Sequence, residues 1–180
     1  MKRASTAVTI VCLLIATIAL SQTSAPVQKP GPEHKKMETF VGTWSYEGDA
    51  KKTVFGPAGK VTGTDVYEML PGGFYLQHRY DEKNPLGNMK GTEIWAYDPV
   101  KKVYTNNYFN STGEWGSGTF TINGNTWAFT GSAITYDGKT AYWRWTATLA
   151  NPTSFNVKAE ASSDGKTYVL GFEGKWTKTK

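Results

Sequence analysis

The feature that most constrains the fold of this chain is a period-two alternation that continues from Phe40 almost to the C-terminus. β-branched and aromatic residues alternate with polar ones, and glycine, asparagine and proline turns interrupt them after roughly eight to twelve positions. The pattern predicts about ten strands, at 40–50, 61–70, 74–82, 90–98, 102–110, 114–122, 125–134, 140–149, 154–162 and 167–177.

The turns between these strands contain residues that tolerate a positive φ, as short hairpin connections require. They include Pro-Gly-Gly at 71–73, Asn-Gly at 123–124 and Asp-Gly at 137–138 and 164–165. A meander of about ten antiparallel strands must split into two sheets or close on itself to remove its edges. The sequence therefore predicts an all-β fold, a single up-and-down antiparallel β-barrel with a short N-terminal helix.

The predicted helix lies in the sequence PEHKKMETF. Pro32 and Glu33 are typical of a first helical turn, and Met37 and Phe40 are three residues apart, which fits one or two helical turns. We expect this segment to form a small lid or plug on the barrel. His34 lies on its polar side, where we expect it to be solvated.

The N-terminus has the pattern of a Sec signal peptide. Lys2 and Arg3 precede an apolar run, and small residues follow at two possible cleavage sites, after Ser21, which we favour, and before Pro26. The run of roughly thirteen apolar residues is short for a membrane span of about twenty, so we expect no stable membrane insertion after cleavage, and an uncleaved anchor is the alternative. We predict an exported protein, periplasmic or secreted, with a signal peptide at 1–21, a flexible linker at 22–32 and a barrel domain at 33–180.

Composition excludes several classes of partner and site. The formal net charge is +5, two units of which come from Lys2 and Arg3, and the remaining basic residues form no stripe, so we expect no nucleic-acid binding. The single cysteine, Cys12, falls in the predicted signal peptide, so the exported domain would be held by its core and not by disulfides. With two histidines and no other cysteine, the sequence predicts no metal site.

Alternation also assigns side chains to the barrel interior. The inward set includes Ala141, Trp143, Trp145, Ala147 and Leu149 on strand 140–149, and Phe74, Leu76, His78 and Tyr80 on strand 74–82. If Tyr67 and Met69 point inward, so does Asp65, whereas strand 90–98 does not resolve its faces. Glycines on the strands either leave room for a ligand or relieve crowding around bulky aromatic rings, and both explanations stay open.

Three segments resemble a known family. HKKMETFVGTW, YEMLPGGFYLQHRYDEK and KGTEIWAYDPVKKVYT resemble the bacterial family called domain of unknown function 1579, over nearly the whole predicted mature chain. In addition, FVGTW at 40–44 is similar to the Gly-x-Trp opening of the calycins, the lipocalins and fatty-acid-binding proteins. Resemblance to calycins implies a barrel whose first-strand tryptophan, here Trp44, closes one end and packs near a basic residue of the last strand, Lys175 or Lys178. The last strand has no arginine, so a fatty-acid carboxylate clamp is not expected.

These observations support three functional hypotheses. We favour a non-enzymatic, lipocalin-like binding protein that holds a small, mostly apolar molecule in an aromatic-lined barrel. Its candidate ligand-binding residues are Trp44, Tyr67, His78, Tyr80, Trp143 and Trp145. The first alternative is a small barrel enzyme that uses His78 as general acid or base. The second is a cell-envelope carbohydrate interaction module with exposed aromatics such as Trp115 and Tyr142.

His78 is the most informative of these residues. An inward imidazole can ligate haem iron, transfer a proton, or form a hydrogen bond with Tyr67 or Asp65 across the barrel. Haem is therefore the one cofactor that the sequence leaves open. No nucleophile elbow, phosphate loop or dinucleotide-binding motif is present, and we assign no catalytic residues. The sequence does not specify the ligand or the oligomeric state.

Overall fold

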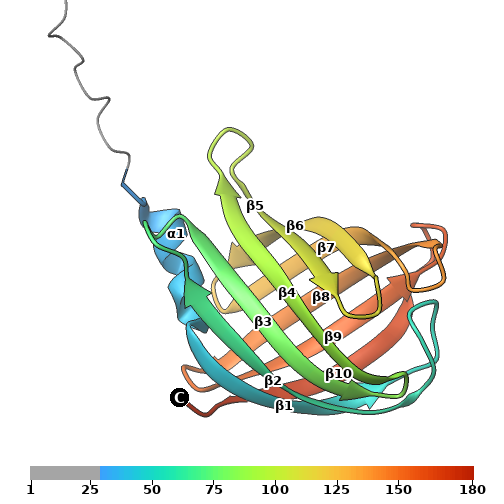
Figure 1. The fold of residues 1–180 in the computed structure, drawn as a ribbon. Coiled ribbons are helices and arrows are strands. Elements are labelled where there is room, and N and C mark those ends of the chain that lie inside the picture. The colour runs from blue at the N-terminus through green and yellow to red at the C-terminus, as the bar shows by residue number, and fades with distance from the viewer. Residues whose placement is uncertain (1–28) are drawn as a thin grey trace, which may run out of the picture.

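The computed structural model describes residues 29–180, so the predicted signal peptide and most of the predicted linker lie outside the described residues. Within them, ten antiparallel strands close into one barrel (Figure 1). The strands are β1 (Gly42–Ala50), β2 (Gly59–Met69), β3 (Tyr75–Asn84), β4 (Gly87–Asp98), β5 (Val103–Asn110), β6 (Trp115–Asn123), β7 (Thr126–Ile134), β8 (Thr140–Asn151), β9 (Ser154–Ser162) and β10 (Val169–Lys178). The predicted fold class is confirmed.

The barrel is closed by the pairing of its first and last strands. β1 pairs with β10, which places Trp44 opposite Lys178 and Tyr46 opposite Trp176. Every other pair joins strands that are consecutive in the sequence. This up-and-down order leaves no edge strand in the described barrel, which removes the unpaired backbone groups that an open sheet exposes.

The inward faces follow the predicted alternation. Leu76 and His78 are buried on β3, Ala141 and Ala147 on β8, and Asp65 and Tyr67 on β2. Strand β4, whose faces the sequence did not resolve, points Glu93 and Trp95 inward and buries both. A buried glutamate on this strand explains why its polarity pattern was uninformative.

A short helical segment closes one end of the barrel. Helix α1 (Pro32–Met37) and the 3₁₀ turn η2 (Glu38–Phe40) lie across this end, as Figure 1 shows. The ring of Phe40 packs against aromatic rings of β1, β2, β4, β7 and β9, with centroid separations from 4.6 to 6.4 Å. The predicted plug is therefore confirmed, and we call α1 and η2 together the plug.

Further contacts attach the plug to the barrel wall. Trp44 donates a hydrogen bond from Nε1 to the carbonyl oxygen of Phe40, 2.7 Å away. The Nζ of Lys178 lies 5.3 Å from the centre of the Trp44 ring, so Lys178 and not Lys175 is the basic residue beside this tryptophan. His34 is half-buried and packs edge-on against Phe74 at 5.2 Å, so it is not the fully solvated residue that its polar neighbours suggested.

The opposite end of the barrel, which we call the mouth, is formed by connections between strands. It comprises the loop 51–58 between β1 and β2 and the turns that follow β3, β5, β7 and β9. Among residues 29–180, no helix has the length and apolar content needed to cross a bilayer.

Candidate functional site

The interior of the barrel contains a cavity of about 220 Å³ in the half away from the plug. Near the plug, the interior is filled by packed aromatic rings. The cavity is lined by side chains from five strands, by Phe55 of the β1–β2 loop and by Glu114 of the turn before β6. The lining residues are Phe55, Tyr80, Glu93, Asn106, Tyr108, Glu114, Trp143, Arg144, Trp145 and Ala159. A second hollow of about 230 Å³ lies at the mouth and shares Phe55 and Glu114 with the first.

The aromatic rings of the cavity wall lie opposite small residues on neighbouring strands. The pairing registers place Tyr80 opposite Gly91, Tyr108 opposite Gly116 and Trp143 opposite Gly131. A Cβ atom at Gly116 would approach the Tyr108 ring to 2.6 Å, and one at Gly131 would approach the Trp143 ring to 2.5 Å. The glycines therefore accommodate rings that lie against the wall, and this arrangement leaves the centre of the barrel unfilled.

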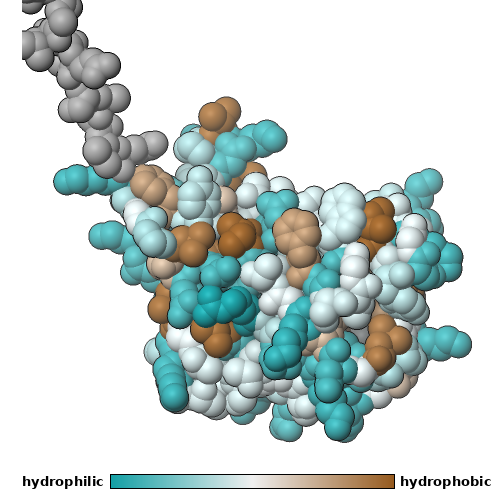
Figure 2. Space-filling view, viewed as in Figure 1, coloured by the Kyte–Doolittle hydropathy of each residue, from teal (hydrophilic) through white to brown (hydrophobic). Residues whose placement is uncertain are grey.

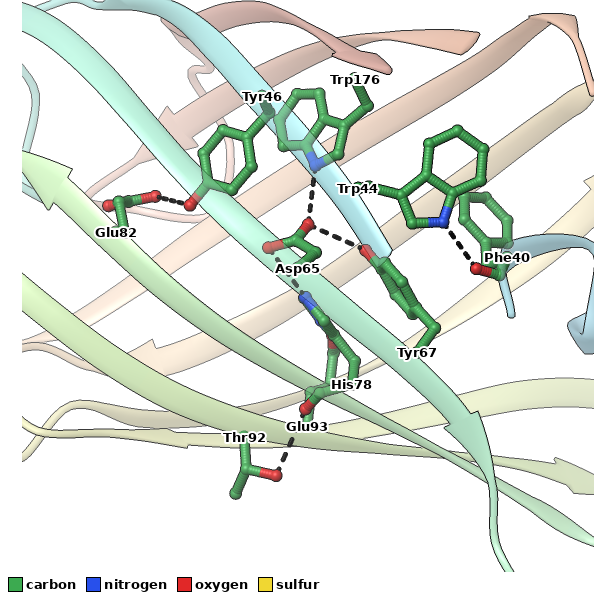
Figure 3. A network of polar contacts seen from close by, with 10 residues as sticks. All are labelled: Phe40, Trp44, Tyr46, Asp65, Tyr67, His78, Glu82, Thr92, Glu93 and Trp176. Atoms are coloured by element: carbon green, nitrogen blue, oxygen red, sulfur yellow. Dashed lines mark hydrogen bonds and ion pairs between the residues drawn. The ribbon is translucent and has the colours of Figure 1, made fainter. Parts of the chain in front are cut away.

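A buried polar network forms the floor between the cavity and the plug (Figure 3). His78 lies between two carboxylates from the adjacent strands. Its Nδ1 is 3.0 Å from Oε2 of Glu93, and its Nε2 is 3.3 Å from Oδ1 of Asp65. The second contact has an ion-pair distance without the alignment of a hydrogen bond. All three side chains are buried.

The two carboxylates have further partners. Oδ2 of Asp65 accepts hydrogen bonds from Trp176 Nε1 at 2.7 Å and from the Tyr67 hydroxyl at 3.2 Å. Oε1 of Glu93 accepts one from Asn106 Nδ2 at 2.5 Å. The Tyr67 ring also stacks on the imidazole of His78, with centroids 4.2 Å apart and planes 9° from parallel. These contacts hold the three charged groups in a single arrangement, as buried polar groups require.

The charge of His78 follows from this arrangement. Burial by itself would lower the pKa of His78, but attraction to Asp65 and the hydrogen bond with Glu93 outweigh it and raise the pKa to about 9. His78 is therefore an imidazolium at neutral pH. It compensates part of the negative charge that Asp65 and Glu93 place inside the barrel.

Two more carboxylates lie nearer the mouth. Glu82 accepts a hydrogen bond from the Tyr46 hydroxyl at 2.7 Å, and Glu114 accepts one from the Tyr108 hydroxyl at 3.1 Å. Burial raises the pKa of Glu82 and that of Glu114, because it disfavours the charged form. The tyrosine hydroxyls oppose this effect by donating to the carboxylates.

The structure divides the predicted site residues into three groups. Tyr80, Trp143 and Trp145 line the cavity together. Trp44 and Tyr67 belong to the packed core beside the plug. His78 lies between these groups, behind Glu93, and does not line the cavity.

Sequence analysis did not assign Glu93, Asn106, Tyr108 or Glu114 to the site. Glu93 and Asn106 are polar residues on strands whose alternation gives no clear inner face. The spacing of aromatic residues could have indicated their inward direction. Trp95 and Tyr97 share a strand face with Glu93, and Tyr104 and Tyr108 share one with Asn106.

The geometry of His78 does not fit haem ligation. Each of its ring nitrogens faces a carboxylate, so neither has a lone pair directed at an iron. Within the described residues, no group of three or more His, Cys, Asp or Glu side chains has an arrangement that could hold a metal ion.

Comparison with known proteins identifies the family. The profile of the family described as "Protein of unknown function (DUF1579)" matches residues 29–179. The chain belongs to this family. A search of curated proteins gives no significant match.

Two solved structures have a fold similar to that of this DUF1579 chain. Rv2717c from M. tuberculosis matches with a TM-score of 0.62 and 10% identity, over 83% of this chain and 99% of that protein. The S-type phycobiliprotein lyase CPES from Guillardia theta matches with a TM-score of 0.55 and 11% identity, over 82% of this chain and 93% of that protein. At these identities the likeness shows the barrel fold alone.

Proposed function

We propose that this protein binds a small, mostly apolar molecule in the cavity between the polar floor and the mouth. The observation that carries the proposal is an aromatic-lined space bordered by buried polar atoms without partners. Oδ1 of Asn106 and Nε1 of Trp143 have no hydrogen-bond partner within the described residues, and both side chains line the cavity. An unpaired buried polar atom destabilises a fold, so a ligand that pairs with one gains affinity.

The size of the cavity limits the ligand. A volume of about 220 Å³ is below the roughly 300–1,000 Å³ of pockets for drug-sized molecules. Tyr80, Tyr108 and Trp143 are among the lining residues, and aromatic rings favour contact with another flat group. The expected ligand is therefore a molecule of one or two rings. We further propose that binding occurs outside the cytoplasm, because residues 1–21 have the pattern of an export signal.

The two alternatives receive less support from the geometry. Catalysis by His78 would require its imidazole to reach a substrate, but Glu93 separates it from the cavity. Carbohydrate binding by the outer surface would require a row of exposed aromatics. Trp115 and Phe109 are exposed opposite each other, but Tyr142 is half-buried. On the face in Figure 2, hydrophobic residues are interspersed with hydrophilic ones.

The proposal is tested by filling the cavity from its wall. Ala159 lines the cavity on β9, whereas Ala128 is exposed on the outside of β7. We expect Ala159→Leu to abolish binding of small aromatic molecules without lowering the thermal unfolding midpoint, and the matched control Ala128→Leu to leave binding unchanged. Binding would be measured by tryptophan fluorescence with a panel of neutral, cationic and anionic two-ring compounds. Native mass spectrometry of the protein purified from its host would detect a retained ligand.

Two results would contradict the proposal. One is that no member of the panel binds the unmodified protein and no small molecule is retained from the host. The other is that Ala159→Leu and Ala128→Leu bind the panel equally well, because the ligand would then lie elsewhere.

A further inference from the structure

The charged groups inside the barrel are strongly unbalanced, although the chain as a whole is basic. Asp65, Glu82, Glu93 and Glu114 face the interior from β2, β3, β4 and the turn before β6. Among residues 29–180, His78 is the only buried basic side chain, and it is already paired with Asp65 and Glu93. The exterior and the N-terminal segment therefore carry more positive charge than the formal net +5 of the whole chain.

The other basic residues near the cavity do not neutralise it. Arg144 contributes to the lining, but it is exposed and its guanidinium lies on the Tyr168 ring, 3.7 Å from the centroid. Lys51 belongs to the mouth and is exposed. Neither cation has a contact with Glu93 or Glu114.

The polar groups that line the cavity are predominantly acceptors. The Tyr108 hydroxyl already donates to Glu114, and Asn106 Nδ2 already donates to Glu93. The remaining acceptor is Oδ1 of Asn106, a residue that is 2% exposed. This oxygen lies over the inner face of β6, since a Cβ atom at Gly118 would lie 2.9 Å from it. An unpaired acceptor needs a hydrogen-bond donor, and the carboxylate of Glu93, which pairs with the same amide, favours a donor that is positively charged.

The aromatic walls favour the same kind of group. Tyr80, Tyr108 and Trp143 line the cavity, and the faces of aromatic rings attract cations. A carboxylate ligand would be repelled by Glu93 and Glu114, and among the buried atoms of the lining the one donor without a partner is Trp143 Nε1.

We propose that the ligand is an organic cation, an amine carried on a flat apolar group, whose ammonium donates to Glu93, Glu114 and Oδ1 of Asn106. This inference rests on the proposed function, because it names the ligand class of the same cavity. The flat group lies between Tyr80, Tyr108 and Trp143. Trp143 Nε1 remains available for a ligand oxygen.

The test compares three probes that differ in charge and share one ring system. They are 2-naphthylmethylamine, 2-naphthylmethanol and 2-naphthoate, titrated at pH 7 into the protein produced from the full chain, with tryptophan fluorescence or calorimetry as the readout. We expect the amine to bind about tenfold or more tightly than the alcohol, because the cation gains contact with partly desolvated carboxylates, and the naphthoate to bind weakest.

Matched variants assign the preference to the carboxylates of the cavity. We expect Glu93→Gln and Glu114→Gln each to reduce the preference for the amine over the alcohol several-fold. The control Glu47→Gln makes the same charge change on the exposed outer face of β1 and should leave the preference unchanged. Glu114→Gln keeps the test decisive if loss of the Glu93 contact to His78 prevents folding.

The outcomes separate the inference from the proposed function. Equal or tighter binding of the alcohol or the naphthoate would overturn the cationic ligand and leave a binding cavity in place. An amine preference that survives both Glu93→Gln and Glu114→Gln would also overturn it. If none of the three probes binds, the inference fails, and failure of the wider panel as well would contradict the proposed function.

Discussion

At the scale of single residues, His78 allows two carboxylates to be buried on neighbouring strands of one barrel. An isolated ionised carboxylate is costly to bury, and Asp65 and Glu93 are both more than nine-tenths buried. The imidazolium between them offsets part of this cost, and Trp176, Tyr67 and Asn106 supply hydrogen bonds to the remaining oxygens. Removing the charge of His78 would leave both carboxylates without a cationic partner.

This arrangement predicts a stability that depends on pH. The pKa of His78 is raised from 6.5 to about 9 in the folded state, so its contribution is fully present below pH 6.5 and is lost as pH rises through 9. We expect the free energy of unfolding to decrease over this window by an amount on the order of 3 kcal/mol. Urea denaturation at a series of pH values would measure it. His78→Gln should be less stable at pH 7 and should flatten the profile, and a wild-type profile that is flat or rises between pH 6.5 and 9 would disprove the assignment.

At the scale of elements, the plug and the cavity occupy opposite ends of the barrel. Phe40 packs among five aromatic rings at one end, while the cavity adjoins the mouth at the other. Helix α1 is held to the wall because the Tyr104 hydroxyl donates to the Glu33 carboxylate at 2.6 Å. The plug therefore contributes to stability without bordering the cavity.

Truncation of the Phe40 side chain should show that the plug affects stability and not ligand binding. We expect Phe40→Ala to lower the free energy of unfolding by about 3–5 kcal/mol, the usual cost of removing a buried aromatic ring. Binding of the two-ring probes at a temperature where the variant is folded should be unchanged. Val100→Ala, at a position that is 89% exposed in the turn between β4 and β5, is the control and should change stability little. A variant that is as stable as the wild type, or that has lost binding while folded, would show that the division is wrong.

The strands also show which inward side chains could be predicted from the sequence and which could not. The inward direction of His78 was predictable because Phe74, Leu76 and Tyr80 alternate cleanly with polar residues. The direction of Glu93 was not, because Ile94 and Trp95 are adjacent and give β4 an apolar residue on each face. Asn106 was missed for a related reason. The amide nitrogen of Asn106 donates a hydrogen bond to Glu93 on the neighbouring strand. The pattern of polar residues along one strand does not indicate a partner on another strand.

At the scale of the whole molecule, closure makes every strand an interior strand. β1 and β10 are paired on both sides, and β5 and β6 are too. The terminal strands of the domain therefore have the same hydrogen bonding as those in the middle of the sequence. A barrel of this kind is expected to unfold as one cooperative unit.

Native-state hydrogen exchange tests this expectation. We expect the slowest-exchanging amides of β1 and β10 to have the same opening free energy as those of β5 and β6, because no strand can be removed without breaking two pairings. If β1 and β10 exchanged through a separate opening of much lower free energy, the barrel would behave as an open sheet in solution.

The glycines opposite the cavity rings have a consequence for how such a protein changes over evolution. Gly91, Gly116 and Gly131 bear no side chain that a ligand could touch, yet a methyl group at any of them would clash with the aromatic ring opposite, and at Gly116 and Gly131 also with a backbone carbonyl of the next strand. The width of the cavity thus depends on glycines of the strands adjacent to the aromatic residues that form its surface. Relatives that conserve every lining residue but exchange one of these glycines for alanine are expected to accept narrower ligands. Ligand range within the family should therefore be compared at these wall positions as well as at the lining.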